Sequence, residues 1–189
     1  MTLDLTVLTD GELAALSVAG RDTAFAEIMR RYREPIYRII AGNIGDADEA
    51  LDLVQESFVS AYRALARYQA DRPMRRWLAT IALNKCRDWR RRRAVRRLFA
   101  FALPLEDGAG RVIDDRSLPD ADVAARQELV RVSRAIAELP ASLREPLVLR
   151  TFQDMSQAET AATLSISEKA VETRVRRARA RLAERLKVD

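Results

Sequence analysis

Residues 46–67, with the sequence DADEALDLVQESFVSAYRALAR, show the most regular hydrophobic spacing in the chain. Their apolar side chains recur at intervals of three and four residues, at Leu51, Val54, Phe58, Ala61 and Leu65. This spacing places one apolar stripe along an α-helix, and Asp46 stands where a helix N-cap is expected. Other periodic segments share the helical period, and none alternates convincingly with the period of two that marks a strand. The sequence therefore predicts an all-α protein.

The last third of the chain predicts a helix-turn-helix unit. Two capping boxes, Ser142-Leu-Arg-Glu145 and Ser156-Gln-Ala-Glu159, each open a short helix. A brief turn then leads into a basic helix, whose inward stripe is Val171, Val175, Ala178 and Leu182. Ser165 stands in that turn where many such units carry glycine, so we expect a strained or differently wound backbone there.

The chain has 189 residues with 33 Lys and Arg against 28 Asp and Glu, and the basic surplus lies in two blocks. Residues 85–97 hold eight basic side chains and one acid, and residues 169–187 hold eight basic side chains and two acids. Between them lies an acidic segment with two glycines and two prolines, a composition typical of a linker. We therefore expect two small helical domains joined by a flexible linker, over residues 1–95, 96–124 and 125–189.

The composition excludes several kinds of chemistry. The chain has no histidine and only one cysteine, Cys86, which removes the usual general base, imidazole metal ligands and any intrachain disulfide. We expect no catalytic residue, no metal site and no cofactor. Because no run of about 18 apolar residues and no signal-peptide pattern occurs, we expect a cytoplasmic protein without membrane insertion. The net charge of +5 fits either a generally solvated surface or a polyanionic partner.

Several short motifs occur together in a fixed order. Asp52-Leu-Val-Gln-Glu56 comes first, Trp77-Leu-Ala-Thr-Ile81 with Asn84 follows, and Met155-Ser-Gln-Ala-Glu159 precedes Val171-Glu-Thr-Arg174. In this order and spacing the chain resembles bacterial RNA polymerase sigma factors of the extracytoplasmic-function (ECF) group. The resemblance covers both predicted domains and leaves only the linker unaligned. It implies a protein that binds core RNA polymerase and directs it to promoter DNA, often under the control of an anti-sigma factor.

The resemblance assigns the acidic side of residues 46–67 to the clamp coiled coil of the polymerase. From the residues alone, an acidic face on a basic protein is either a docking surface for a basic partner or a solvated face with local pairing. The resemblance favours docking. The predicted polymerase-binding residues are Asp48, Asp52, Gln55 and Glu56.

The first basic block and the loop before its helix are expected, by the same resemblance, to read and open the −10 promoter element. Arginines can neutralise phosphates there, although such a run alone also fits an RNA-binding arm or a localisation signal. The ring of Tyr68 either stacks on a captured base or is a partly buried aromatic at the domain edge. Asn84 matches a family position implicated in reading −10 DNA. The predicted −10 residues are Tyr68, Arg72, Asn84, Arg87, Arg91 and Arg92.

The last basic helix is expected to read the −35 element in the major groove. Arginine can bind guanine there through two hydrogen bonds, and flanking basic residues can contact phosphates. Glu172 departs from the family, which commonly has a basic residue there; its carboxylate accepts from a cytosine amino group or pairs with a neighbouring arginine. The predicted −35 residues are Lys169, Glu172, Thr173, Arg174, Arg176 and Arg177.

Two other functions compete with the sigma-factor interpretation. A free-standing helix-turn-helix regulator that acts without polymerase would explain residues 156–187, but it leaves the acidic helix and the first domain without a role. A helical nuclease that uses carboxylates would explain the many acids, but the sequence shows no inward-facing carboxylate cluster. Removal of the second domain distinguishes the first alternative, because residues 1–95 of a sigma factor should still bind core polymerase.

Overall fold

The computed structural model describes residues 3–102 and 120–187, and throughout these ranges its regular elements are helices, which confirms the all-α prediction. The first part of the chain forms η1 (Leu5–Val7), α1 (Asp10–Val18), α2 (Asp22–Ile44), α3 (Ala47–Ala64), η2 (Leu65–Arg67) and α4 (Met74–Ala102). The second part forms α5 (Asp120–Ala137), α6 (Ala141–Phe152), α7 (Gln157–Leu164) and α8 (Glu168–Lys187).

Helices α1–α4 pack around one apolar core. The side chains of Leu13, Ile28, Ile39 and Ile40 are fully buried in it, and Leu53 from α3 is nearly so. Local signals fix where two of these helices begin. The side chain of Thr9 accepts a hydrogen bond from the Glu12 backbone and completes a capping box on α1, and the side chain of Asp46 caps α3 as predicted.

The register of α3 differs from the prediction at its first apolar position. Leu51 is 45 % exposed, whereas Leu53, which the predicted stripe omits, is 2 % exposed. The buried face of α3 is wider than a single stripe because it packs against both α2 and α4, and it also takes in Ala50 and Ser57. Leu51 therefore belongs to the outer side of the helix, together with the acidic residues.

Helices α5–α8 form the second unit, around the core residues Ile136, Leu139, Leu147, Val148, Val171 and Ala178. The capping box at Ser156 and Glu159 is present, but the one predicted at Ser142 is wrong. Pro140 is the N-cap of α6 and makes no side-chain capping bond, and Glu145 instead forms an ion pair with Arg87 of α4.

Helices α7 and α8 are joined by a tight turn, which confirms the predicted helix-turn-helix. Ser165 lies in the left-handed region with φ 54° and ψ 47°, a conformation that costs a residue with a side chain more than it costs glycine. The Ser167 hydroxyl accepts a hydrogen bond from the Ala170 backbone at the start of α8.

The expected domain boundaries fall inside or close to helices. Helix α4 continues past residue 95 to Ala102, and α5 already begins at Asp120, so helices enter both ends of the segment expected to be a linker. The middle of that segment, residues 103–119, lies outside the described residues.

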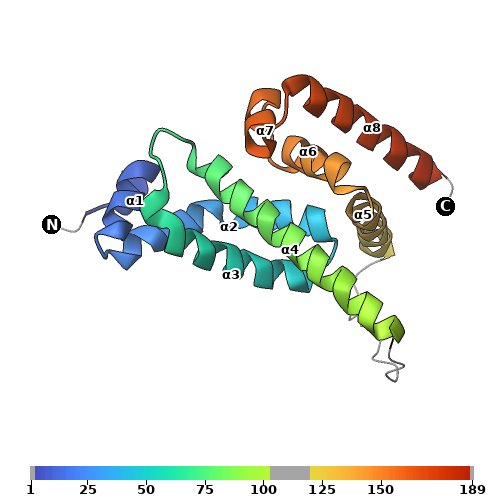
Figure 1. The fold of residues 1–189 in the computed structure, drawn as a ribbon, viewed down its shortest axis with the longest axis horizontal. Helices are drawn as coiled ribbons and strands as arrows, with labels where there is room; N and C mark the ends of the chain where they lie inside the picture. The colour runs from blue at the N-terminus through green and yellow to red at the C-terminus, as the bar shows by residue number, and fades with distance from the viewer. Residues whose placement is uncertain (1–2, 103–119, 188–189) are drawn as a thin grey trace.

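The two units pack side by side, with α6 against α2 and α7 against α4 (Figure 1). Leu149 and Met155 of the second unit are buried in the apolar core of the first. Gly42 lies inside α2 and faces Phe152 of α6. Helix α2 ends at Ile44, and its C-cap, Gly45, has the left-handed conformation typical of a helix C-terminus.

The corrected register of α3 makes a matched pair of truncations informative. We expect Leu53→Ala to lower the free energy of unfolding by about 2–5 kcal/mol, because it leaves a cavity in the core. Leu51→Ala should change it by less than about 1 kcal/mol, because its side chain is half exposed. Urea unfolding followed by circular dichroism measures both values, and equal losses would contradict this register.

Candidate functional site

The outer side of α3 carries an exposed surface that is both acidic and apolar. Asp48, Asp52 and Gln55 are exposed on it. Leu51, Val59 and Tyr62 share this side at three- and four-residue spacing, each 45–48 % exposed. We call these six residues the α3 face.

The fourth predicted polymerase-binding residue lies apart from the α3 face. The carboxylate of Glu56 is turned toward α4, where it lies 3.4 Å from Lys85 Nζ and 3.9 Å from Arg92 Nη2. The apolar part of the α3 face was not predicted, because the hydrophobic spacing places Leu51 in the core. The spacing of Leu51, Val59 and Tyr62 on the polar side of the helical wheel is the signal that could have found it.

Tyr68 and Arg72 belong to the loop between η2 and α4. The Tyr68 hydroxyl donates a hydrogen bond to the Arg72 carbonyl oxygen at 2.7 Å, and its ring lies 5.2 Å from that of Trp77, centroid to centroid. Partial burial raises the pKa of Tyr68. This packing corresponds to the domain-edge interpretation of Tyr68, whereas Arg72 is exposed.

Three of the predicted −10 residues follow one another along one side of α4. Asn84, Arg87 and Arg91 are three and four residues apart and are exposed. The Arg87 guanidinium donates to Asn84 Oδ1 at 3.1 Å and, through two nitrogens, to the Glu145 carboxylate at 2.8 and 2.6 Å. Arg91 pairs with Asp88 of its own helix.

Some of the remaining arginines of the first basic block make contacts within the fold. Arg90 is half buried and donates hydrogen bonds to the carbonyl oxygens of Asn43 and Ala137, which lie at the C-terminal ends of α2 and α5. Arg93 lies over the ring of Trp89 at 4.9 Å. A count of charges along the sequence does not distinguish the half-buried Arg90 from the exposed arginines around it.

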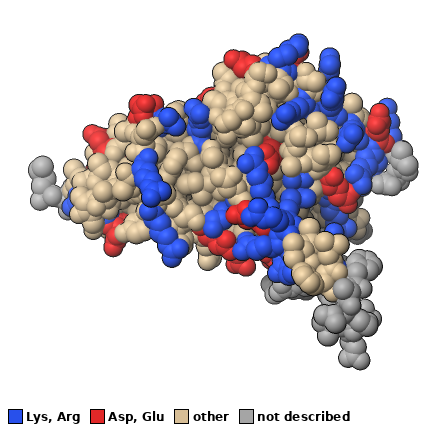
Figure 2. Space-filling view, in the orientation of Figure 1, with Lys and Arg blue, Asp and Glu red and all other residues tan. Residues whose placement is uncertain are grey.

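Basic side chains gather over the distal half of α4 and over α8 (Figure 2). On α8, Arg176 and Arg177 are exposed, and Thr173 and Arg174 are partly exposed. Glu172 pairs with Lys169 at 2.9 Å, and this hydrogen bond lowers the pKa of Glu172. The neighbour that pairs with Glu172 is therefore a lysine rather than the arginine considered from the sequence.

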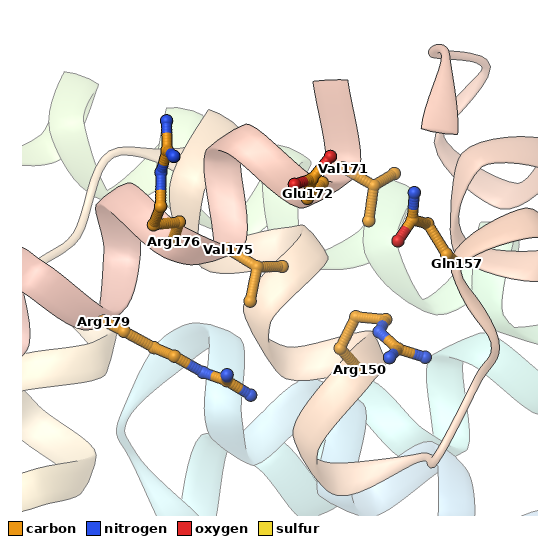
Figure 3. A pocket seen from close by; sticks show the side chains of 7 residues that line it. All are labelled: Arg150, Gln157, Val171, Glu172, Val175, Arg176 and Arg179. Carbon is orange, nitrogen blue, oxygen red and sulfur yellow. The ribbon is translucent and has the colours of Figure 1, made fainter. Parts of the chain in front are cut away.

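A hollow of about 290 Å³ lies beside the predicted −35 residues (Figure 3). Arg150 of α6 and Gln157 of α7 line one side of it, and residues of α8 that include Arg176 and Arg179 line the other. The Gln157 amide also donates a hydrogen bond to the Glu168 carbonyl oxygen at 3.0 Å, which ties α7 to the start of α8. Arg150 was missed from the sequence because it reaches this surface only through the packing of α6.

In residues 3–102 and 120–187, no group of three or more Cys, Asp or Glu side chains is placed to hold a metal ion. None of the described helices has the length and apolarity that crossing a membrane requires.

Comparison with known families finds two matches in the chain. Residues 28–96 match Sigma-70 region 2, and residues 129–182 match Sigma-70, region 4. The first match holds the α3 face and most of α4, and the second holds the helix-turn-helix.

Individual relatives match across nearly the whole chain. RNA polymerase sigma factor CnrH of Cupriavidus metallidurans is 40 % identical over 95 % of both chains, and ECF RNA polymerase sigma factor SigM of Mycobacterium tuberculosis is 35 % identical over 94 % of this chain and 85 % of its own. Among solved structures, CnrH in complex with the cytosolic domain of CnrY matches with a TM-score of 0.69 and 35 % identity, covering 95 % of this chain and 98 % of that one.

A second solved structure, the sigma factor RpoE in complex with the anti-sigma factor NepR from Bartonella quintana, matches with a TM-score of 0.67 and 25 % identity over 87 % of this chain and 98 % of that one. Both conserved sigma regions, the fold and relatives of nearly equal length thus agree with the motifs and their order. The chain belongs to the sigma-70 family of RNA polymerase sigma factors, in its extracytoplasmic-function group.

Proposed function

We propose that this sigma factor binds core RNA polymerase through the α3 face. The observation that supports this most is the composition of the face, in which exposed Leu51, Val59 and Tyr62 are interspersed with Asp48, Asp52 and Gln55. Exposed apolar side chains beside acidic ones fit a partner surface that combines basic and apolar side chains. Glu56 adds a carboxylate apart from the face, beside α4.

The −10 element is bound by α4 and the loop before it. Asn84, Arg87 and Arg91 present one amide and two cations along a single side of the helix, where they can contact a base edge and successive phosphates. Arg92 and Arg72 extend this surface on either side. Tyr68 contributes by holding the loop through its hydrogen bond to the Arg72 carbonyl oxygen.

The −35 element is bound by α8. Thr173, Arg176 and Arg177 meet the base edges, with Glu172 placed to accept from a cytosine amino group once it separates from Lys169. Lys169 and Arg174 bind phosphates beside them. The hollow lined by Arg150 and Arg179 offers a further place for a backbone phosphate.

The protein acts in the cytoplasm, uses no cofactor and leaves the chemistry of RNA synthesis to the polymerase. An anti-sigma factor restrains it. This is supported by the two solved relatives, one in complex with the cytosolic domain of CnrY and the other with the anti-sigma factor NepR. A pull-down from cells under non-inducing conditions should recover a stoichiometric protein inhibitor, and recovery of none would count against this partner.

The polymerase interface is tested by reversing one charge. Asp52→Arg should weaken binding to core polymerase by at least about tenfold, because it places a cation against a basic partner. Glu34→Arg makes the same charge change on α2, where Glu34 is 64 % exposed, and should bind normally. Co-elution of each purified variant with core polymerase measures the effect. Normal binding by Asp52→Arg would refute the α3 face as the polymerase interface. No binding by the wild type, while it protects a specific duplex alone, would favour the free-standing regulator.

The two DNA surfaces should respond differently to loss of an arginine. Arg177→Ala should weaken the binding free energy by about 1–3 kcal/mol on promoters with a matched −35 element. On promoters with a mismatched −35 element it should change the binding free energy little. Arg92→Ala should weaken binding to all DNA alike and reduce the slope of log K against log salt by about 0.9. Salt titrations of holoenzyme on matched and mismatched promoter fragments separate the two, and the same effect from both variants would refute this division of roles.

A further inference from the structure

Tyr62 of the α3 face is fixed by contacts with α2 although it is 46 % exposed. Its hydroxyl donates a hydrogen bond to Asp22 Oδ1 at 3.0 Å. Its ring lies edge-on to that of Phe25, with 5.0 Å between the ring centroids. Both ends of the side chain are therefore held in place before any partner arrives.

The contact with Phe25 connects Tyr62 to the apolar core. Phe25 is 7 % exposed and packs against Phe58 of α3, with 6.4 Å between the ring centroids and 80° between the ring planes. Phe58 is itself only 2 % exposed. Edge-to-face pairs of this kind are favourable beyond the area that they bury. A row of three rings thus runs from the core to the α3 face, and the packing of the inner two positions the outermost one.

Asp22 is the first residue of α2 and lies 40 residues before Tyr62 in the chain. The positive end of the helix dipole favours a carboxylate at this place. The hydrogen bond to this carboxylate raises the pKa of Tyr62, so the hydroxyl remains a donor at neutral pH. The contact ties the first turn of α2 to the last turn of α3.

A side chain that is ordered beforehand is a better anchor for a partner. An exposed tyrosine ordinarily moves among staggered rotamers, and confining it on binding costs affinity. The contacts of Tyr62 confine its ring in the free chain. Tyrosine is also enriched among the few residues that carry most of the affinity of a protein interface, whereas leucine and valine are under-represented there. Of the three apolar residues of the α3 face, Tyr62 is therefore the expected anchor.

Asp22 and Phe25 lie outside both the α3 face and the segment matched by the family comparison. The match to Sigma-70 region 2 begins at residue 28, whereas Asp22 and Phe25 belong to the first turn of α2. A role for these two residues in the interface therefore rests on their contacts with Tyr62 and not on a family motif.

We propose that Asp22 is a positioning residue for the polymerase interface: it holds Tyr62, the main apolar anchor of the α3 face, in the rotamer in which core polymerase receives the ring. This rests on the proposed role of that face. Asp22 acts through the oxygen that accepts the hydrogen bond, and not through its charge. Removal of the acceptor and removal of the donor free the same side chain, so the two losses are one effect.

A double-mutant cycle on the full-length chain tests this role. The dissociation constant for core polymerase is measured for Asp22→Ala, which removes the acceptor, for Tyr62→Phe, which removes the donor but keeps the ring, and for the double variant. Each single change should weaken binding about fivefold, the cost of confining one side chain. The double variant should also lose about fivefold rather than about 25-fold, because both changes break the same hydrogen bond.

Further variants separate positioning from charge and rank the apolar residues. Asp22→Asn removes the charge but keeps an oxygen that can accept the hydrogen bond, so it should recover most of the binding that Asp22→Ala loses. Tyr62→Ala should weaken binding at least about thirtyfold, and Leu51→Ala about threefold or less. Glu34→Ala is the control, because it removes a 64 % exposed acid of the same helix that pairs with Arg38, and it should bind as the wild type does.

The order of the ring is measured without polymerase. Carbon-13 relaxation of labelled tyrosine rings in the free chain should show a more mobile Tyr62 in Asp22→Ala than in the wild type. The Tyr62 resonance is identified by its loss in Tyr62→Phe. Equal ring order in Asp22→Ala and the wild type would overturn the positioning role.

The outcomes separate this role from the proposed function. Normal binding by Asp22→Ala, while Asp52→Arg has lost binding, would overturn the positioning role and leave the polymerase interface in place. Losses that multiply in the double variant, or a loss by Asp22→Asn as large as that by Asp22→Ala, would also overturn it. Should Asp22→Ala lose its helical circular dichroism, Tyr62→Phe carries the test alone. Normal binding by Asp52→Arg would refute the interface and the positioning role with it.

Discussion

Helix α2 is the element on which the rest of the structure depends. Ile28, Ile39 and Ile40 are fully buried on it, and α1, α3 and α4 pack around these side chains. The C-terminal part of the same helix carries Gly42 and Asn43, which meet α6 of the second unit. One helix therefore contributes to the first core and also packs against the second unit. Its length and its C-cap at Gly45 position the elements that pack on it.

The proposed binding surfaces differ in whether they contact the second unit. Helix α3 lies on the far side of α2 and α4 from α6 and α7 (Figure 1), and the six residues of the α3 face are exposed. The side of α4 that carries Arg87 faces the second unit and is partly engaged by Glu145. In this packing the proposed polymerase surface has no contact with the second unit, whereas the proposed DNA surface contacts it at Arg87.

Local features of the fold could be predicted from the sequence, because their causes lie within a few residues of one another. The capping boxes at Thr9 and Ser156 depend on side chains that bond to backbone three residues away, and the helix-turn-helix follows from the hydrophobic spacing of two neighbouring segments. The exposure of Arg176 and Arg177 followed from the inward stripe of α8.

Features that depend on distant partners could not be predicted in this way. Leu51 and Leu53 differ in burial because α3 packs against two helices at once, which a single stripe does not describe. Glu145 fits a capping-box spacing, but an arginine 58 residues away binds it instead. Likewise, Arg90 counts toward a basic block in the sequence, yet it serves to satisfy the carbonyl oxygens at two helix ends.

The central claim, that this chain directs core polymerase to particular promoters, is tested most directly by transcription in vitro on total genomic DNA from its source bacterium. Core polymerase with the chain should yield RNA 5′ ends at discrete sites that share two sequence elements, near −10 and −35. Core polymerase alone should not yield 5′ ends at these sites. If the added chain leaves the distribution of 5′ ends as it is with core polymerase alone, the claim is contradicted.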